Sequence, residues 1–119
     1  MALFNSEMTP EKAIEALGSD KEAKVEKGIE FLTAGGAELL PFMVKRFGEI
    51  VPQATRSKKH QLAAERLYDL LCGAELPVEL CASFLESLLN APENLSFNLD
   101  ELPVDVVING YSFLEETIR

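Results

Sequence analysis

The sequence predicts an all-α domain, and three observations favour this fold class. Apolar residues recur at steps of three and four along most of the chain, which is the spacing of one helix face. Glycine and proline stand at the ends of most of these segments, where helices begin and stop. Hydrophobic residues make up 47% of the chain, which is typical of a globular protein. We expect a single domain over residues 1–119, with five to six helices stacked as antiparallel helical hairpins.

The first predicted helix begins at Thr9-Pro10-Glu11 and ends near Leu17. Threonine is a favoured N-cap, proline fits the first helical position, and an acid in the first turn complements the helix dipole. Gly18 then supplies a stop signal. We expect residues 1–8 to form a flexible N-terminal tail.

Residues 19–51 are predicted to form two amphipathic helices that fold back on each other across Gly35-Gly36. Ser19 and Glu22 have the spacing of a capping box at the start of the first of these helices. The two apolar stripes consist of Val25, Gly28, Ile29 and Leu32, and of Leu40, Met43, Val44, Phe47, Ile50 and Val51.

Two prolines define the limits of the second helix, and a glycine lies within the first. Pro41 fits only in a first turn, and Pro52 stops the second helix. Gly28 lies on the apolar stripe, where glycine costs about 1 kcal/mol of helix stability relative to alanine. Either a neighbouring helix approaches closely at Gly28, or the glycine is simply tolerated there.

The same stretch contains, in order, Leu17-Gly18-Ser19-Asp20, a charged helix, a glycine-containing turn and Glu38-Leu39-Leu40-Pro41. This order resembles one repeat of the HEAT family over about 35 residues. Gly28 occupies a place comparable to the small residue on the buried face of the family's first helix. Lys24 is only a loose counterpart of the family's basic residue in that helix. The resemblance implies a short solenoid of helical hairpins that makes protein–protein contacts.

Two more helices follow a connector at residues 52–57. Ser57 or Thr55 can cap the fourth helix, which runs to Cys72, and the fifth begins after Pro77. Their buried faces are expected to be Ala63, Ala64, Leu67, Leu70 and Leu71, and Cys81, Phe84, Leu85 and Leu88. We expect these two helices to form a second pair.

The last quarter of the chain fits two structures. Residues 95–99 alternate between apolar and polar, and Asn109-Gly110 is a strong turn signal, so a small β-hairpin at residues 104–115 is one interpretation. The other is a sixth helix, because six apolar residues also lie at helical spacing. They are Val104, Val107, Ile108, Tyr111, Leu114 and Ile118. We favour the helix.

Net charge and hydropathy exclude several functions. The net charge of −9 disfavours nonspecific binding to nucleic acids and to anionic membrane surfaces, which both require clustered positive charge. No apolar run approaches the roughly 18 residues that span a bilayer, and the N-terminus lacks the pattern of a secretory signal. We therefore expect a cytoplasmic protein.

Positive charge is nevertheless concentrated in residues 45–66, which contain six of the eleven Lys and Arg residues and two acids. This window predicts a basic corner that attracts an acidic partner, unless it is an ordinary solvated loop. Phe31, Tyr68 and Phe113 lie off the apolar stripes or at their edges, so they are candidate anchors unless they close a second helical layer. The candidate partner-binding residues are Lys45, Arg46, Arg56, Lys58, Lys59, Phe31 and Tyr68.

Motifs for catalysis or cofactor binding are not evident. Cys72 and Cys81 lack the spacing of a zinc site and are expected to be buried free thiols. His60 is the only histidine, and no glycine-flanked nucleophile accompanies it. Gly35-Gly36 lacks the lysine and strand of a phosphate-binding loop. We expect no metal, no cofactor and no enzymatic activity.

Two functions remain as hypotheses. The first is a protein–protein interaction or scaffolding module that uses a groove between helices and the basic corner to bind another protein. The second is an acidic regulator that places residues 74–119, with a net charge of −8, on a basic site of its target. Self-association of the basic corner with the acidic end is compatible with the same charge distribution.

Overall fold

The computed structural model describes residues 8–118 except 94, 96 and 98, and side chains are not described at 99 and 113–118. The α-helices are α1 (Pro10–Leu17), α2 (Glu22–Gly35), α3 (Leu40–Ile50), α4 (Lys58–Cys72), α5 (Val78–Leu89) and α6 (Val104–Ile118). Short 3-10 turns are η2 (Gly36–Leu39), η3 (Val51–Thr55) and η4 (Leu99–Glu101). The described residues contain no strand, so the all-α prediction is confirmed and the β-hairpin at 104–115 is wrong. The tail predicted at residues 1–8 lies outside the described residues except for Met8, which packs against the core.

Side-chain caps fix the start of two helices as the sequence predicts. The Thr9 hydroxyl accepts a hydrogen bond from the Lys12 amide at 3.1 Å at the start of α1. The Ser57 hydroxyl accepts from the His60 amide at 3.3 Å at the start of α4. Each such cap satisfies an amide that would otherwise lack a partner, and contributes about 1 kcal/mol.

The capping box predicted at the start of α2 is wrong. The Ser19 hydroxyl accepts from the amide of Lys21 at 3.0 Å, two residues away, and so closes a local turn. Lys21 is the N-cap of α2 and its side chain makes no capping hydrogen bond. The helix therefore begins too late for Ser19 to act as its cap.

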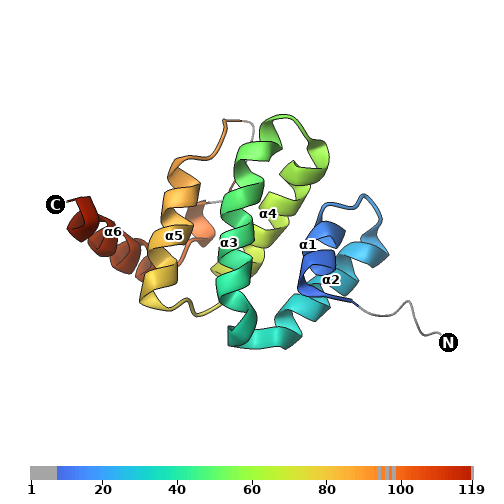
Figure 1. The fold of residues 1–119 in the computed structure, drawn as a ribbon, viewed down its shortest axis with the longest axis horizontal. Helices are drawn as coiled ribbons and strands as arrows, with labels where there is room; N and C mark the ends of the chain where they lie inside the picture. Colours follow the sequence, from blue (N-terminus) through green and yellow to red (C-terminus); the bar gives the residue numbers. More distant parts are fainter. Residues whose placement is uncertain (1–7, 94, 96, 98, 119) are drawn as a thin grey trace.

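The helices pack as three consecutive pairs, α1 with α2, α3 with α4 and α5 with α6, which Figure 1 shows from one end of the molecule to the other. The predicted pair across Gly35-Gly36 is wrong, because α2 packs on α1 while α3 packs on α4 and α5. Gly36 has a φ of 63°, which favours glycine, and η2 then redirects the chain away from α2. The pairing is shifted by one helix from the predicted one.

Gly28 is the site of a close helix approach, which is one of the two alternatives that the sequence left open, and the neighbour is α1. A Cβ atom at Gly28 would lie 2.7 Å from the carbonyl oxygen of Ala13 and 3.1 Å from the Cβ of Ala16. The two backbones can approach this closely only because residue 28 has no side chain.

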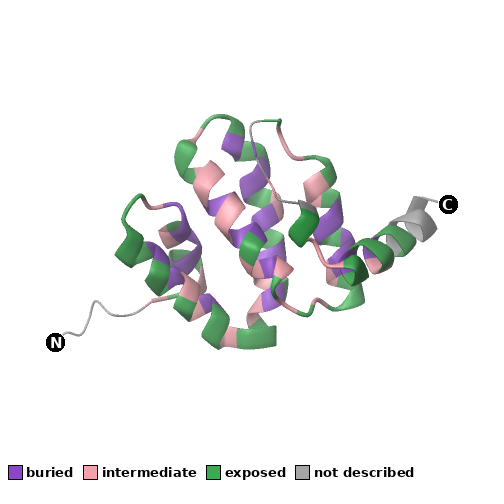
Figure 2. Cartoon of the chain, turned by 180° about the vertical axis from the view of Figure 1, so that it is seen from behind, coloured by how far each residue is buried: buried purple, intermediate pink, exposed green. Residues whose placement is uncertain are grey.

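An aromatic cluster joins the middle and last pairs of helices. The Phe47 and Phe84 rings pack edge to face at 5.2 Å between centroids, and the Tyr68 and Phe97 rings lie 4.7 Å apart. Phe97 comes from the connection between α5 and α6, where Leu95 is also buried. Figure 2 shows buried positions along α3, α4 and α5 in the middle of the molecule. Residues 95–99 alternate between apolar and polar, which is typical of a strand. Here the apolar side chains of Leu95 and Phe97 instead pack into a core formed by helices.

The part of α6 with described side chains packs through a narrow face. Val106 and Gly110 face α5, and a Cβ at Gly110 would lie 2.8 Å from the Cys81 carbonyl oxygen. Among the apolar residues that predicted the helix, those with described side chains point outward instead. We call the four with described side chains the α6 stripe, and their exposed fractions are 69% for Val104, 39% for Val107, 57% for Ile108 and 63% for Tyr111. Figure 2 shows most of the described positions of α6 as exposed.

Candidate functional site

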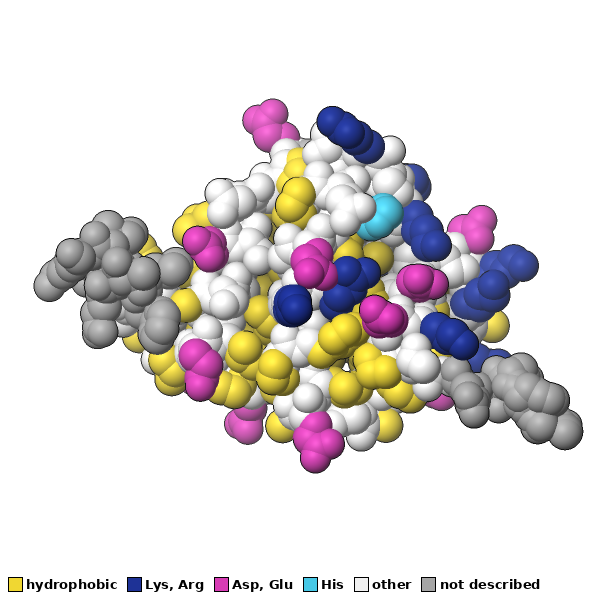
Figure 3. All heavy atoms as spheres, viewed as in Figure 1, with side chains coloured by type: hydrophobic (Ala, Val, Ile, Leu, Met, Phe, Trp, Pro, Cys, Tyr) yellow, Lys and Arg dark blue, Asp and Glu magenta, His cyan; other side chains and the backbone are white. Residues whose placement is uncertain are grey.

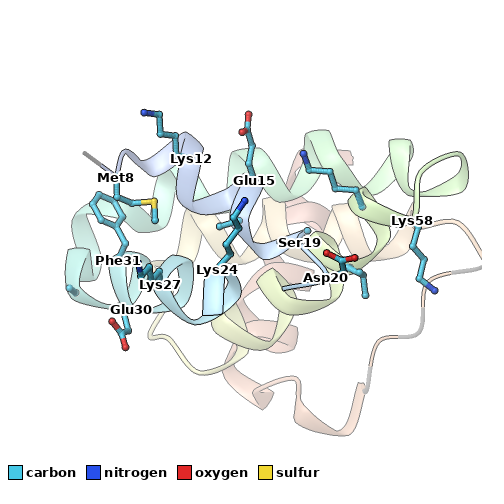
Figure 4. A pocket seen from close by; sticks show the side chains of 15 residues that line it. Met8, Lys12, Glu15, Ser19, Asp20, Lys24, Lys27, Glu30, Phe31 and Lys58 are labelled. Atoms are coloured by element: carbon cyan, nitrogen blue, oxygen red, sulfur yellow. The ribbon is translucent and has the colours of Figure 1, made fainter. Parts of the chain in front are cut away.

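A broad open groove of about 1310 Å³ lies between α1, the α1–α2 connection, α2 and the first turns of α4. We call it the lysine groove. It is lined by Met8, Lys12, Glu15, Ala16, Gly18, Ser19, Asp20, Lys24, Lys27, Glu30, Phe31, Ala34, Lys58, Lys59 and Leu62. Figure 4 shows Met8 and Phe31 at one end of the groove and Lys58 at the other.

The lysine groove is cationic in a protein whose net charge is −9. Five lysines and three acidic residues line it. Within the described part of the chain, four of the lysines form no ion pair with a carboxylate: Lys24, Lys27, Lys58 and Lys59. Figure 3 shows Lys and Arg side chains concentrated toward the end of the molecule that contains α1 and α2. The groove thus offers several ammonium groups to an anionic partner.

Apolar side chains share the groove with these lysines. Met8, Phe31 and Leu62 are each half-buried, so part of each remains in contact with solvent. A partner that covers them removes further apolar surface from water, at about 25 cal/mol per Å². The groove can therefore attract a partner through apolar contacts, and its lysines favour a partner that carries negative charge.

The sequence did not indicate that Lys12, Lys24 and Lys27 belong to this site. Each of these lysines has acidic residues close by in the sequence. The net charge of its segment is therefore not positive and does not indicate a basic site. The signal that could have found two of them is helical spacing. Lys24, Lys27 and Phe31 follow at steps of three and four on α2, on a different face from the buried Val25, Gly28 and Leu32.

The predicted basic corner is divided by the fold. Lys58 and Lys59 line the lysine groove, but Lys45, Arg46 and Arg56 do not. Lys45 and Arg56 are exposed on α3 and just after η3. The Arg46 guanidinium forms an ion pair with Glu49 at 2.6 Å, one turn along the same helix.

The two predicted aromatic anchors whose side chains are described, Phe31 and Tyr68, have different positions. Phe31 is half-buried and lines the lysine groove, where a partner can reach it. Tyr68 is only 1% exposed, so its prediction as a surface anchor is wrong. Its ring packs on Phe84 and Phe97 because the connection after α5 covers that side of α4. The side chain of Phe113 lies outside the described residues.

Arg66 fixes one boundary of the groove. Its guanidinium Nη1 donates to the carbonyl oxygens of Leu17 at 2.6 Å and Ser19 at 2.9 Å. These carbonyls lie at the C-terminal end of α1 and just beyond it, where helix carbonyls lack intrahelical partners and carry partial negative charge. Arg66 therefore ties α4 to the α1–α2 connection.

We expect Arg66→Lys to lower the free energy of unfolding by about 1–2 kcal/mol, because the lysine nitrogen ends one bond short of Nη1, the atom that donates to both carbonyls. Urea unfolding followed by circular dichroism measures the change. Arg56→Ala is the matched control, since Arg56 is exposed and should change stability by no more than about 0.5 kcal/mol. Equal effects of the two substitutions would contradict this role of Arg66.

The ionisable groups of the core are poorly suited to nucleophilic chemistry. Both cysteines are free thiols, as predicted, but only Cys81 is buried and Cys72 is half-buried. Burial raises the pKa of both thiols. The Cys81 thiol donates to the Leu76 carbonyl oxygen at 3.6 Å. Burial also raises the pKa of Tyr68, and a hydrogen bond with Cys72 acts in the same direction. These groups therefore remain protonated near neutral pH. In the described residues, no group of His, Cys, Asp and Glu is arranged to hold a metal ion.

Fold and site together define a small all-α protein with an open cationic groove at one end and an exposed apolar helix face at the other. Comparison with known proteins found no matching family model, no similar curated protein and no similar solved structure. Among the described residues, no helix has the length and apolar character required to cross a membrane.

Proposed function

We propose that this protein is a non-catalytic interaction module that binds an acidic, amphipathic segment of another protein in the lysine groove. The observation that supports it most is the set of four lysines without ion pairs around half-buried apolar side chains. Charge complementarity of this kind selects partners and speeds their association, while the buried apolar contacts provide affinity.

The groove's composition supports one class of partner, an acidic amphipathic helix. An amphipathic helix presents apolar anchors at positions i, i+3, i+4 and i+7, which suits the apolar residues between the lysines. Carboxylates beside these anchors would meet the ammonium groups of Lys24, Lys27, Lys58 and Lys59. Each exposed pair adds only about 0.2–1 kcal/mol, so several must act together.

The proposed function is still a protein–protein interaction module that resembles helical-repeat scaffolds. The pairing of the helices and the recognition residues differ from those that the sequence predicts. The helical hairpins of such a stack would be α1–α2, α3–α4 and α5–α6. The recognition residues would be the lysines of α1, α2 and α4 together with Phe31. Lys45, Arg46 and Arg56 are left out because they lie away from the groove.

Selection of displayed helical peptides on the intact protein tests the proposal. We expect the selected sequences to combine carboxylates with apolar residues at helical spacing. Reversing the charge of the groove with Lys24→Glu and Lys27→Glu should weaken binding of a selected peptide by about tenfold or more, which is about 1.4 kcal/mol. Fluorescence anisotropy measures the affinity, which should also fall as ionic strength rises.

Lys45→Glu together with Arg56→Glu provides the matched control. These substitutions change the net charge by the same amount but lie outside the groove. We expect the control to keep its affinity within about threefold, a difference of less than 1 kcal/mol. Equal weakening by both double variants would mean that the peptides respond to net charge alone, and the proposal would fail.

A further inference from the structure

The α6 stripe has the properties of a helical ligand. Val104, Val107, Ile108 and Tyr111 follow the i, i+3, i+4, i+7 pattern of an anchoring helix face. They stay exposed because Val106 and Gly110 already attach α6 to α5, through the close contact of Gly110 with the Cys81 carbonyl. The helix is therefore held in place with its larger apolar face free.

The charges beside the α6 stripe are negative. Glu101 and Asp105 are exposed at the start of α6, and in the sequence all charged residues from position 74 to 118 are acidic. The lysine groove carries the opposite sign. The α6 stripe thus has both features that the proposed function requires of a partner, namely helical apolar anchors and neighbouring carboxylates.

The two surfaces lie at opposite ends of the molecule. Figure 1 places α6 at one end and the α1–α2 pair at the other, and the longest dimension is 55 Å. Because α6 is fixed on α5, it cannot reach the lysine groove of its own chain. Contact between two α6 stripes would bring the Glu101 and Asp105 carboxylates of both copies into the same interface, which disfavours a symmetric dimer.

We propose that the α6 stripe of one copy docks into the lysine groove of a second copy, so that the protein associates head to tail. This inference rests on the proposed function of the groove, because it identifies the partner of that same site. Each bound pair of copies leaves one free groove and one free α6 stripe, on different copies. The contact is therefore heterologous, and assembly continues into chains or closes into a ring.

Complementation between two variants of the full chain tests this assembly. The groove variant carries Lys24→Glu and Lys27→Glu, and the α6 variant carries Ile108→Ser and Tyr111→Ser, all at exposed positions. A single helix in a groove is a small interface, so sedimentation velocity should cover about 1 µM to about 500 µM. We expect the average mass of the unmodified protein to rise with concentration from the 13.1 kDa of the monomer.

Each variant alone should remain at the monomer mass of 13.1 kDa, because each lacks one half of the contact. An equimolar mixture should give a species of twice that mass and nothing larger, since one intact groove and one intact α6 stripe remain per pair. An unmodified protein that stays monomeric at all concentrations would overturn the inference. So would a groove variant that still self-associates, or a mixture that stays monomeric.

The peptide-binding experiment separates failure of this inference from failure of the proposed function. Selected peptides that bind the groove while the full chain stays monomeric would leave the proposed function standing and reject the second copy as its partner. Loss of peptide binding with the groove variant, together with complementation by the α6 variant, is the result expected when both hold.

Discussion

Phe84→Ala is expected to lower the free energy of unfolding by about 3–5 kcal/mol. Phe84 has no exposed surface, and its ring lies 5.2 Å from Phe47 and 5.9 Å from Tyr68 between centroids. It therefore joins α5 to both α3 and α4. Removing the ring leaves a cavity that the surrounding side chains can fill only in part. Since domains of this size are stable by roughly 5–15 kcal/mol, the loss is a large fraction of the total.

Urea unfolding followed by far-ultraviolet circular dichroism measures this loss as a lower midpoint with a similar slope. Leu89→Ala is the matched control on the same helix, because Leu89 is 72% exposed and its truncation should change stability by about 0.5 kcal/mol at most. A similar destabilisation by both substitutions would show that the aromatic cluster does not organise the core.

The individual helices were predictable because their signals are local. Thr9 and Ser57 cap the helices that they precede. The apolar positions predicted for α3 are buried, and so are those predicted for α4 except Leu70, which is half-buried. Such effects depend on residues within a few positions of each other, so the sequence contains all the information needed. Ser19 is the exception. Its hydroxyl was predicted to accept from the amide of Glu22, but it accepts from the neighbouring amide of Lys21.

The pairing of the helices was not predictable in the same way. An amphipathic stripe indicates that a helix needs a neighbour, but it does not identify that neighbour. Gly28 and Gly110 decide the first and last pairs by allowing close contact with backbone carbonyls of α1 and α5. The same reasoning applies to α6. Its large apolar residues predicted the helix, but Val106 and Gly110 determine which face packs on α5.

The lysine groove depends on this pairing, which is why the sequence revealed only part of it. Lys58, Lys59 and Phe31 were predicted as partner-binding residues from charge density and from position off the stripe. Lys24 and Lys27 join them only because α2 lies beside α1 rather than beside α3. A site assembled from three helices cannot be identified by a charge average over one segment.

Gly28→Leu is expected to destabilise the protein by about 3 kcal/mol, and mainly in the α1–α2 pair. Leucine favours a helix over glycine by up to about 1 kcal/mol, which alone would stabilise α2. The new Cβ, however, would lie 2.7 Å from the Ala13 carbonyl oxygen, a backbone atom that cannot rotate away. Overpacking of this kind typically costs 1–3 kcal/mol or more, and the rest of the leucine side chain adds to it, so the steric effect prevails.

Hydrogen exchange locates this effect, and peptide binding shows whether it reaches the groove. Amides of α1 and α2 should lose protection, while those of α3 and α4 should keep most of theirs, because α3 and α4 have their own contacts. Ala23→Leu is the matched control, since residue 23 is exposed on the same helix. Displacement of α1 also moves one wall of the lysine groove, so Gly28→Leu should weaken binding of a selected peptide although residue 28 does not line the groove. Unchanged protection and affinity would mean that α1 and α2 do not depend on their close contact at Gly28.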